Sequence, residues 1–297
     1  MTLSLATRAA SLPIAYRLYL PREWAEDDVR RRKAQIPDAV GFKTKPQIAL
    51  DQIAAALQAG MSPGVVLADG GYGKDGAFRA GLTALGLSYM VGVPLTTGVW
   101  PAGVEPPAKA WSGRGQRPSR LEREGAYAPV SVKTLAMDLA AQDWRIVVWR
   151  EGSNQTLSSR FAAMRIRPAP WDLKGSELPP LEWLLIEWPE GEEEPTNYWL
   201  STLPEQTSLE TLVDTAHLRW RIERDYEELK SELGLTHFEG RSWRGFHHHA
   251  TLCIAAYGFL IRERSAFPPS AAQKRQAPAI SARPKPRGAP DPARAAR

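Results

Sequence analysis

The sequence has only one cysteine, Cys253, in 297 residues. A single thiol cannot form an intramolecular disulfide, and because it lies in an apolar run we expect a buried structural residue, not a nucleophile. That run, TLCIAAYGFLI at 251–261, is the longest apolar stretch and is well short of the ~20 residues that span a bilayer. The N-terminus also lacks the charged and then apolar pattern of a signal peptide. We therefore expect a soluble, cytoplasmic protein with no membrane contact.

Net positive charge is confined to the C-terminal end of the chain. Of the formal net charge of +5, residues 265–297 carry seven Lys/Arg against one acid, which leaves a net charge of −1 for residues 1–264. The high pI is therefore weak evidence that the folded part binds nucleic acid. Residues 265–297 consist largely of Pro, Ala and Arg, so they cannot bury enough apolar surface to offset the entropy of ordering, and we expect a disordered tail.

Strand and helix patterns alternate in the first third of the chain. Residues 2–20 predict two strands joined by a tight turn, and Thr44 predicts the cap of a helix that ends at Gly60. The run VVLAD at 65–69 is typical of a strand buried in the middle of a sheet; a helix at 75–85 and a strand at 87–94 follow it. This order implies crossover connections and parallel strands, hence an α/β fold.

The character changes at about residue 95. A Pro-, Gly- and Arg-rich loop that contains Arg114 and Arg117 is followed by four strand patterns between 144 and 204, and six of the eleven tryptophans lie in this part. We interpret residues 95–200 as an inserted β-rich subdomain. The loop arginines either follow DNA phosphates or belong to a solvated loop.

Residues 208–233 predict one long helix, capped by Ser208 and ended by Gly234. The apolar residues of this helix account for its buried faces. They do not account for a row of four mostly charged residues, at spacings of four, three and four, that lies along one face of the helix: Arg219, Glu223, Tyr226 and Lys230. One interpretation is a solvated ladder of salt bridges. The other is a metal-binding carboxylate between two cations that hold phosphates.

Asp69 is the second candidate site residue. It follows the predicted strand at 65–69, where open α/β sheets place their sites, although a strand-end Asp also caps turns. Asp69 and Glu223 together would supply hard oxygen ligands for Mg²⁺ from two rigid elements, as a two-metal phosphoryl-transfer site requires. Arg219 and Lys230 would then hold substrate phosphates.

These motifs resemble those of the DDE transposases of bacterial insertion sequences, above all the groups named insertion sequence four and seven-hundred-one. The resemblance covers most of residues 1–264. The last catalytic helix of that superfamily carries a Tyr, Arg, Glu, Lys signature; Arg219, Glu223 and Lys230 match its spacing, and Ala216 takes the place of the Tyr. VVLADGGYG resembles the strand with the second catalytic Asp of the family, which corresponds to Asp69.

The resemblance implies an RNase H-like core, two Mg²⁺ or Mn²⁺ ions held by Asp69 and Glu223, and double-stranded DNA as partner, both as transposon ends and as target. It leaves a homodimer open. The first catalytic Asp of the family should precede residues 2–20, yet no acidic residue occurs before Glu23. We therefore expect that the chain lacks the first strand and is inactive or impaired, since two carboxylates bind metal poorly.

The resulting prediction is an α/β protein with an RNase H-like core whose first strand is missing. Residues 1–94 form the first part of the core, 95–200 the β-rich insertion, 201–264 the catalytic helix with the last helical part, and 265–297 the tail. The expected function is metal-dependent DNA strand cleavage and transfer at insertion-sequence ends. The alternatives are a noncatalytic DNA-binding remnant that interferes with a full-length transposase, and an unrelated metal-dependent nuclease.

Overall fold

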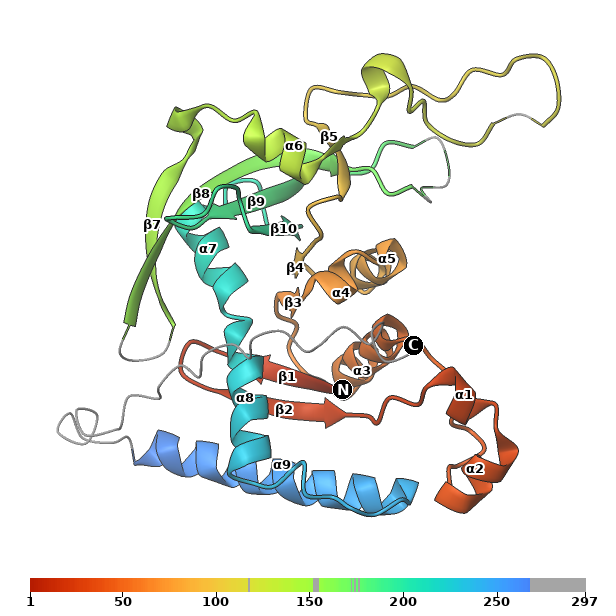
Figure 1. Ribbon diagram of the computed structural model, residues 1–297, viewed down its shortest axis with the longest axis vertical. Helices are drawn as coiled ribbons and strands as arrows, with labels where there is room; N and C mark the ends of the chain where they lie inside the picture. Colours follow the sequence, from red (N-terminus) through yellow and green to blue (C-terminus); the bar gives the residue numbers. More distant parts are fainter. Residues whose placement is uncertain (117, 152–154, 172, 174, 176, 268–297) are drawn as a thin grey trace, which may run out of the picture.

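The computed structural model describes residues 1–267 except 117, 152–154, 172, 174 and 176. It shows a mixed α/β fold, with a two-stranded hairpin, an eight-stranded sheet and helices around both (Figure 1). The strands are β1 (Thr2–Ala6), β2 (Ser11–Tyr16), β3 (Val66–Ala68), β4 (Tyr89–Gly92), β5 (Gly98–Pro101), β6 (Val130–Ser131), β7 (Arg145–Glu151), β8 (Gln155–Pro168), β9 (Glu182–Trp188) and β10 (Asn197–Ser201). The helices are α1 (Arg22–Ala25), α2 (Asp28–Ala34), α3 (Lys45–Gln58), α4 (Gly70–Gly73), α5 (Gly76–Ala84), α6 (Val132–Met137), α7 (Leu209–His217), α8 (Trp220–Ser231) and α9 (Trp243–Ala266). All but the first three residues of the predicted tail lie outside the described residues.

The N-terminal hairpin confirms the predicted pair of strands. β1 and β2 are antiparallel, and the turn between them is closed by a hydrogen bond from the Thr7 amide to the Ala10 carbonyl, at 2.8 Å. Both strands are shorter than the pattern at 2–20 suggests. Helix α8 crosses the hairpin and α9 runs along it (Figure 1), so the hairpin has its own helical cover.

Helix α3 begins where the sequence predicts. The Gln47 amide donates to Thr44 Oγ1 and the Thr44 amide donates to Gln47 Oε1, at 3.4 and 2.9 Å, which is a reciprocal capping box. α3 packs against both hairpin strands and against α5. It therefore connects the hairpin to the α/β part of the fold.

β3 and β4 are parallel, with Val66 opposite Tyr89, and α4 and α5 form the crossover between them. The prediction of parallel strands is thus confirmed, but the prediction that residues 65–69 lie in the middle of a sheet is wrong. β3 is an edge strand, because the other neighbour of β4 is β10, which pairs with it antiparallel. All three residues of β3 are only half-buried.

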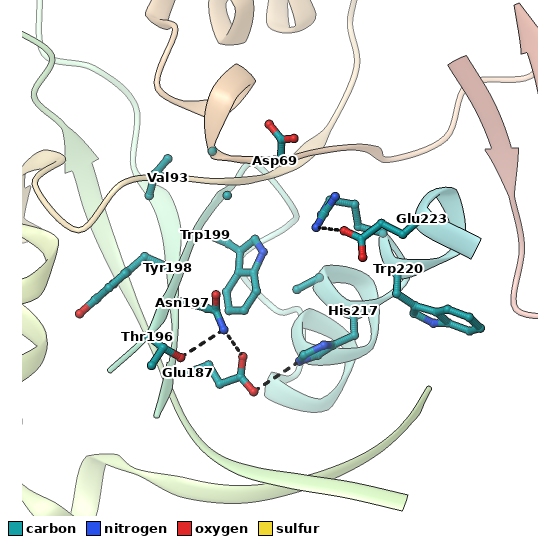
Figure 2. Close-up of a pocket in the computed structure, with 14 residues that line it drawn as sticks. Asp69, Val93, Glu187, Thr196, Asn197, Tyr198, Trp199, His217, Trp220 and Glu223 are labelled. Atoms are coloured by element: carbon teal, nitrogen blue, oxygen red, sulfur yellow. Dashed lines mark hydrogen bonds and ion pairs between the residues drawn. The ribbon is translucent and has the colours of Figure 1, made fainter. Parts of the chain in front are cut away.

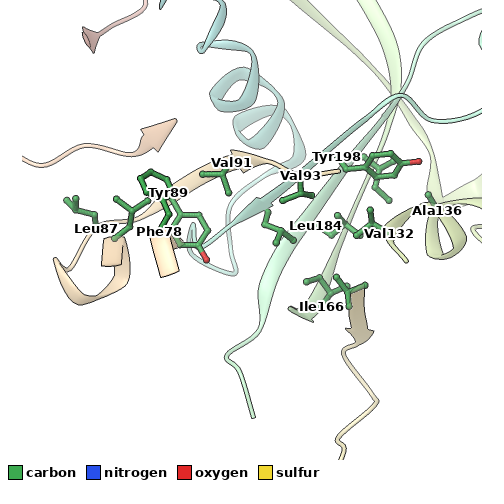
Figure 3. Close-up of a cluster of buried hydrophobic side chains, with 14 of the residues drawn as sticks. Phe78, Leu87, Tyr89, Val91, Val93, Val132, Ala136, Ile166, Leu184 and Tyr198 are labelled. Atoms are coloured by element: carbon green, nitrogen blue, oxygen red, sulfur yellow. The ribbon is translucent and has the colours of Figure 1, made fainter. Parts of the chain in front are cut away.

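The strands of residues 95–200 extend the same sheet. β10 pairs with β9 and β9 with β8; β8 also pairs with β5 and β7. One buried cluster runs through both parts and joins Phe78 and Val91 to Ile166 and Leu184 (Figure 3). The core is therefore shared between the first third of the chain and the β-rich segment.

The predicted helix at 208–233 is wrong in one respect, because it is divided into α7 and α8. Around Leu218 and Arg219 the backbone bonds change to i→i−3, including Ile222 to Arg219 at 3.1 Å. The two halves pack on different partners, which explains the division. Leu212 and Val213 of α7 lie on the large sheet, while Leu229 of α8 packs against Cys253 and Tyr257 of α9.

Within the described part of the chain, no helix is both long and apolar enough to cross a membrane. The longest helix, α9, has 24 residues but carries arginines, histidines and a glutamate among its apolar positions.

Candidate active site

Asp69 lies directly after β3 and caps the short helix α4. Its Oδ1 accepts a hydrogen bond from the Gly71 amide at 2.8 Å, so the carboxylate is turned toward the start of α4. The side chain is exposed, which leaves its second oxygen available to a ligand. Both interpretations of Asp69, as a cap and as a site residue, are therefore compatible with its position.

The glycines of the GGYG turn allow α4 to approach β4 closely. A Cβ on Gly73 would lie 1.9 Å from the Gly92 carbonyl oxygen and 3.1 Å from Val91 Cβ. No side chain fits there without a shift of the backbone. Gly73 thus fixes the loop that holds Asp69 against the sheet.

Glu223 lies on the other wall, on the exposed face of α8. Arg219 Nη2 donates to Glu223 Oε1 at 2.7 Å, which is the i, i+4 contact that a ladder of salt bridges predicts. The side chains of Arg219 and Glu223 are 32% and 65% exposed, so the pair is solvent-screened and stabilises the fold little. A cation or a phosphate could replace either partner at low cost.

The tertiary structure brings these residues to one cleft. Asp69, Arg219 and Glu223 all line a cleft of about 350 Å³, although the strand end and the helix are far apart in the sequence. Figure 2 shows Asp69 on one side, Glu223 on another, and the side chain of Trp199 between the walls. The cleft is polar at its rim and open to solvent.

Three further polar residues at the base of the cleft were missed by the sequence interpretation. Asn197 Nδ2 donates to Glu187 Oε2 at 2.9 Å, and His217 Nε2 lies 3.9 Å from Glu187 Oε1 (Figure 2). Glu187 is only 4% exposed, and the His217 ring stacks on Trp149 at 4.3 Å between centroids. The available signal for this group was Glu187, one of two glutamates in the otherwise apolar strand EWLLIEW.

The other candidate residues do not line this cleft. Tyr226 accepts a hydrogen bond from Thr2 Oγ1 at 2.8 Å, and Lys230 Nζ lies 5.4 Å from the centre of the Tyr226 ring. Arg114 is exposed in the loop that follows β5, and Arg117 lies outside the described residues. The row on α8 therefore divides: Arg219 and Glu223 line the cleft, whereas Tyr226 contacts the hairpin and Lys230 lies over the Tyr226 ring.

Tyr72 follows Asp69 in α4, and its backbone amide donates to the Asp69 carbonyl at 3.0 Å. Burial raises the pKa of the Tyr72 hydroxyl above its ordinary value, and the charges of Asp69 and then Tyr226 raise it further. The phenol is consequently neutral at physiological pH. No sequence signal separated this tyrosine from a packing residue.

The chemistry of the donor set suits a hard divalent cation, but the number of ligands is low. Asp69 and Glu223 offer carboxylate oxygens, the type that Mg²⁺ and Mn²⁺ prefer. Among the described residues, no group of three or more His, Cys, Asp or Glu is placed to hold a metal ion. The two carboxylates thus fit part of a metal site and not a complete one.

Carboxylates on a strand end and on a helix, facing one cleft beside an arginine, are typical of enzymes that transfer phosphoryl groups with divalent metals. Comparison with known families agrees with this class, because the sequence model of the DDE superfamily endonucleases matches residues 1–156. The chain belongs to the DDE superfamily of endonucleases. The match includes Asp69 but ends before Glu223. No curated protein matches the sequence.

Membership of this superfamily indicates an activity of the nuclease or transposase type, with DNA as the substrate. Endonucleases of the superfamily generally use divalent metals. In the described structure, the cleft lined by Asp69, Arg219 and Glu223 has side chains of the kind that this chemistry uses.

Proposed function

We propose that the protein is a transposase by descent, of the type that cleaves and transfers DNA strands at insertion-sequence ends, built on an RNase H-like core. The observation that carries the proposal is that Asp69 and Glu223 share one cleft while the family match covers the first half of the chain. A carboxylate at a strand end and another on a later helix support such a core.

In this proposal, Asp69 and Glu223 are ligands for Mg²⁺ or Mn²⁺, two ions in an intact site. Bound metal would stabilise the charge on the attacking and leaving oxygens of the DNA phosphate. Arg219 holds a substrate phosphate next to Glu223, with which it is now paired at 2.7 Å. Lys230, Tyr226, Arg114 and Arg117 contact DNA outside the cleft, and no nucleophilic side chain is needed because water and then a 3′-hydroxyl attack.

We further propose that this chain is catalytically impaired. Among its described residues, no group of three or more His, Cys, Asp or Glu is placed to hold a metal ion, and Glu187 at the base of the cleft already accepts a hydrogen bond from Asn197. Coordination number and negative charge are both low in such a site, so metal affinity falls. The same observation favours the second candidate function, a noncatalytic DNA-binding remnant that competes with a complete transposase.

The test is a strand-transfer assay on the whole chain with Mg²⁺ or Mn²⁺. DNA segments that flank the coding sequence serve as candidate ends, a plasmid serves as target, and electrophoresis separates cut from joined products. We expect DNA binding without robust cutting. Strong cutting with joined products would refute the impairment and support the transposase, whereas cutting without joining would indicate an unrelated nuclease.

Metal binding gives an independent measurement. Titration with Mn²⁺, followed by electron paramagnetic resonance, should show weak binding with a Kd of about 1 mM. Asp69→Asn and Glu223→Gln should each abolish it, and the matched control Glu205→Gln, at an exposed glutamate away from the cleft, should leave it unchanged. Binding that survives both substitutions would show that the cleft is not the metal site.

A further inference from the structure

The loop that follows β5 forms a narrow arm, residues 108–121, which extends beyond the large sheet (Figure 1). An isolated antiparallel bridge between Ala108 and Leu121 closes the base of the arm. Next to this bridge, the Lys109 amide donates to the Arg120 carbonyl at 2.8 Å. The two sides of the arm are therefore held together where it leaves the fold.

The base of the arm is also anchored in the core of the β-rich segment. Leu121 is 2% exposed and shares a buried cluster with Trp100 of β5 and with Ala169. Beyond this anchor, every residue from 110 to 116 is exposed. The outer part of the arm is thus presented to solvent from a fixed base.

Arg114 lies at the tip of the arm, between two glycines that turn the chain. Gly113 and Gly115 have φ angles of +83° and +74°, in the left-handed region that glycine adopts readily. The indole Nε1 of Trp111 donates to the Gly115 carbonyl at 3.2 Å, so the chain on both sides of Arg114 is tied together. The tip is therefore a preformed turn that carries one cation.

The arm is positively charged, unlike the folded part as a whole. The sequence of residues 108–121 has four Lys/Arg and no Asp or Glu, whereas residues 1–264 together have a net charge of −1. Lys109 forms ion pairs with two glutamates near the base. Arg114 and Arg120 form no ion pair with any residue that the structure describes, so their charges are available to an anionic partner.

One arginine on a thin turn has the dimensions of a contact in the minor groove of DNA. This groove is about 6 Å wide, whereas the major groove, at about 12 Å, holds a helix or a β-ribbon. Because both neighbours of Arg114 are glycines, no adjacent side chain would collide with the walls of the groove. The minor groove is narrowest in A/T tracts, where its negative potential attracts arginine. Gln116 adds an amide that can donate to the minor-groove acceptors of adenine and thymine.

We propose that the arm binds the minor groove of A/T-rich double-stranded DNA, with Arg114 inserted into the groove and Arg120 on a flanking phosphate. The inference rests on the proposed function in taking DNA as the partner, and it adds which groove and which sequences the protein selects. Contact with phosphates alone needs a row of cations and no turn, whereas the tip has one cation between two glycines. The arm lies outside the cleft, so it selects DNA and takes no part in strand cleavage.

The test is fluorescence anisotropy of the whole chain with three labelled duplexes of equal length, at a salt concentration that suppresses nonspecific binding. One duplex contains an A/T tract, the second has G·C pairs in its place, and the third has inosine·cytosine pairs there. Inosine lacks the 2-amino group that guanine presents in the minor groove, but it keeps the major-groove pattern of guanine. We expect the A/T and inosine duplexes to bind at least about fivefold more tightly than the G·C duplex.

Arg114→Ala should abolish this preference and leave weak binding to all three duplexes. The matched control is Arg262→Ala, at an exposed arginine of α9, which removes the same charge and should retain the preference. Gly115→Val tests the turn, because a β-branched residue is strained at a positive φ, and it should weaken the preference too. Thermal unfolding should be unchanged in Arg114→Ala, since the tip lies outside the core.

Four outcomes would overturn the inference. Equal affinity for the three duplexes, or a preference that survives Arg114→Ala, would do so and leave the proposed function intact. Inosine duplexes that bind like G·C duplexes would indicate recognition through the major groove. Tighter binding to an RNA duplex, whose minor groove is wide and shallow, would identify RNA as the partner. Absence of binding to every duplex would contradict the inference and the proposed function together.

Discussion

Asp225 is the most deeply buried carboxylate of the candidate helix α8, with 2% of its surface exposed. Its Oδ1 accepts hydrogen bonds from Ser11 Oγ on β2 and from Tyr257 Oη on α9, the latter at 2.8 Å. One side chain thus joins three elements and fixes the rotation of α8 about its axis. Because Glu223 is two residues away, the same contacts determine which way Glu223 points.

We predict that Asp225→Ala lowers the free energy of unfolding by about 3 kcal/mol, because two hydroxyl donors lose a charged acceptor in a buried site. Tyr257→Phe removes only one of these bonds and should cost about 1.5 kcal/mol. Chemical denaturation of the full chain measures both changes. A loss below about 1 kcal/mol for Asp225→Ala would show that the contacts are dispensable.

Glu182 gives the protein a pH-dependent contribution to stability. Burial raises the pKa of this carboxyl above its ordinary value of 4.5, and the hydrogen bond from Tyr89 and the charges of Arg79 and Arg165 offset the shift only in part. A carboxyl whose pKa is raised in the folded state keeps its proton when the unfolded chain has lost it. Its stabilising effect is therefore complete below pH 4.5 and is lost as the pH rises through the folded pKa.

We predict that the stability of the unmodified chain relative to Glu182→Gln falls as the pH rises above 4.5, by about 1.4 kcal/mol for each unit by which the pKa is raised. Thermal or chemical unfolding at several pH values measures this difference. Glu205→Gln, at an exposed site, should give a flat difference. A difference that rises with pH would mean that Glu182 is charged and paired in the folded state.

At the scale of elements, the position of Asp69 depends on how closely α4 packs on β4. That packing rests on Gly73, where an added Cβ would lie 1.9 Å from the Gly92 carbonyl oxygen. We predict that Gly73→Ala costs about 1–3 kcal/mol of unfolding free energy, the usual cost of excess volume in a packed site, and moves the Asp69 turn.

Gly70→Ala is the matched control, since a Cβ there would lie 3.8 Å from the same Gly92 oxygen, an ordinary contact. It should change the unfolding free energy by less than about 1 kcal/mol, mainly through backbone entropy. Thermal unfolding compares the two variants. Equal stability of both would show that α4 and β4 separate without cost.

At the scale of the whole molecule, net positive charge is concentrated in residues 268–297. The seven Lys/Arg of residues 268–297 exceed the net positive charge of the entire chain, which is +5. Affinity for DNA that depends on counterion release should consequently depend on this segment more than on the cleft.

We predict that truncation after Phe267 weakens nonspecific DNA binding and reduces the slope of log Kobs against log salt concentration by up to about 6, which is 0.9 for each of the lost cations. Filter binding at several salt concentrations, with and without the segment, measures both quantities. An unchanged slope would place the phosphate contacts in residues 1–267 instead.

Much of the local structure could be predicted from the sequence because its causes are local. The Thr44 capping box, the hairpin of β1 and β2 and the parallel pair of β3 and β4 follow from side-chain spacing and from turn and cap residues. The division between α7 and α8 could not be predicted, because it depends on two different packing partners that the sequence of the helix does not contain.

The sequence by itself determined which residues could carry chemistry, namely Asp69 after an apolar strand and Glu223 in a charged helical row. Only the tertiary structure decided that these two share a cleft, that Tyr226 contacts the hairpin instead, and that Glu187 and His217 form the base of the cleft. The physical reason is that propensity and periodicity act over a few residues, whereas a cleft or a groove requires segments that only the packing of the whole chain brings together.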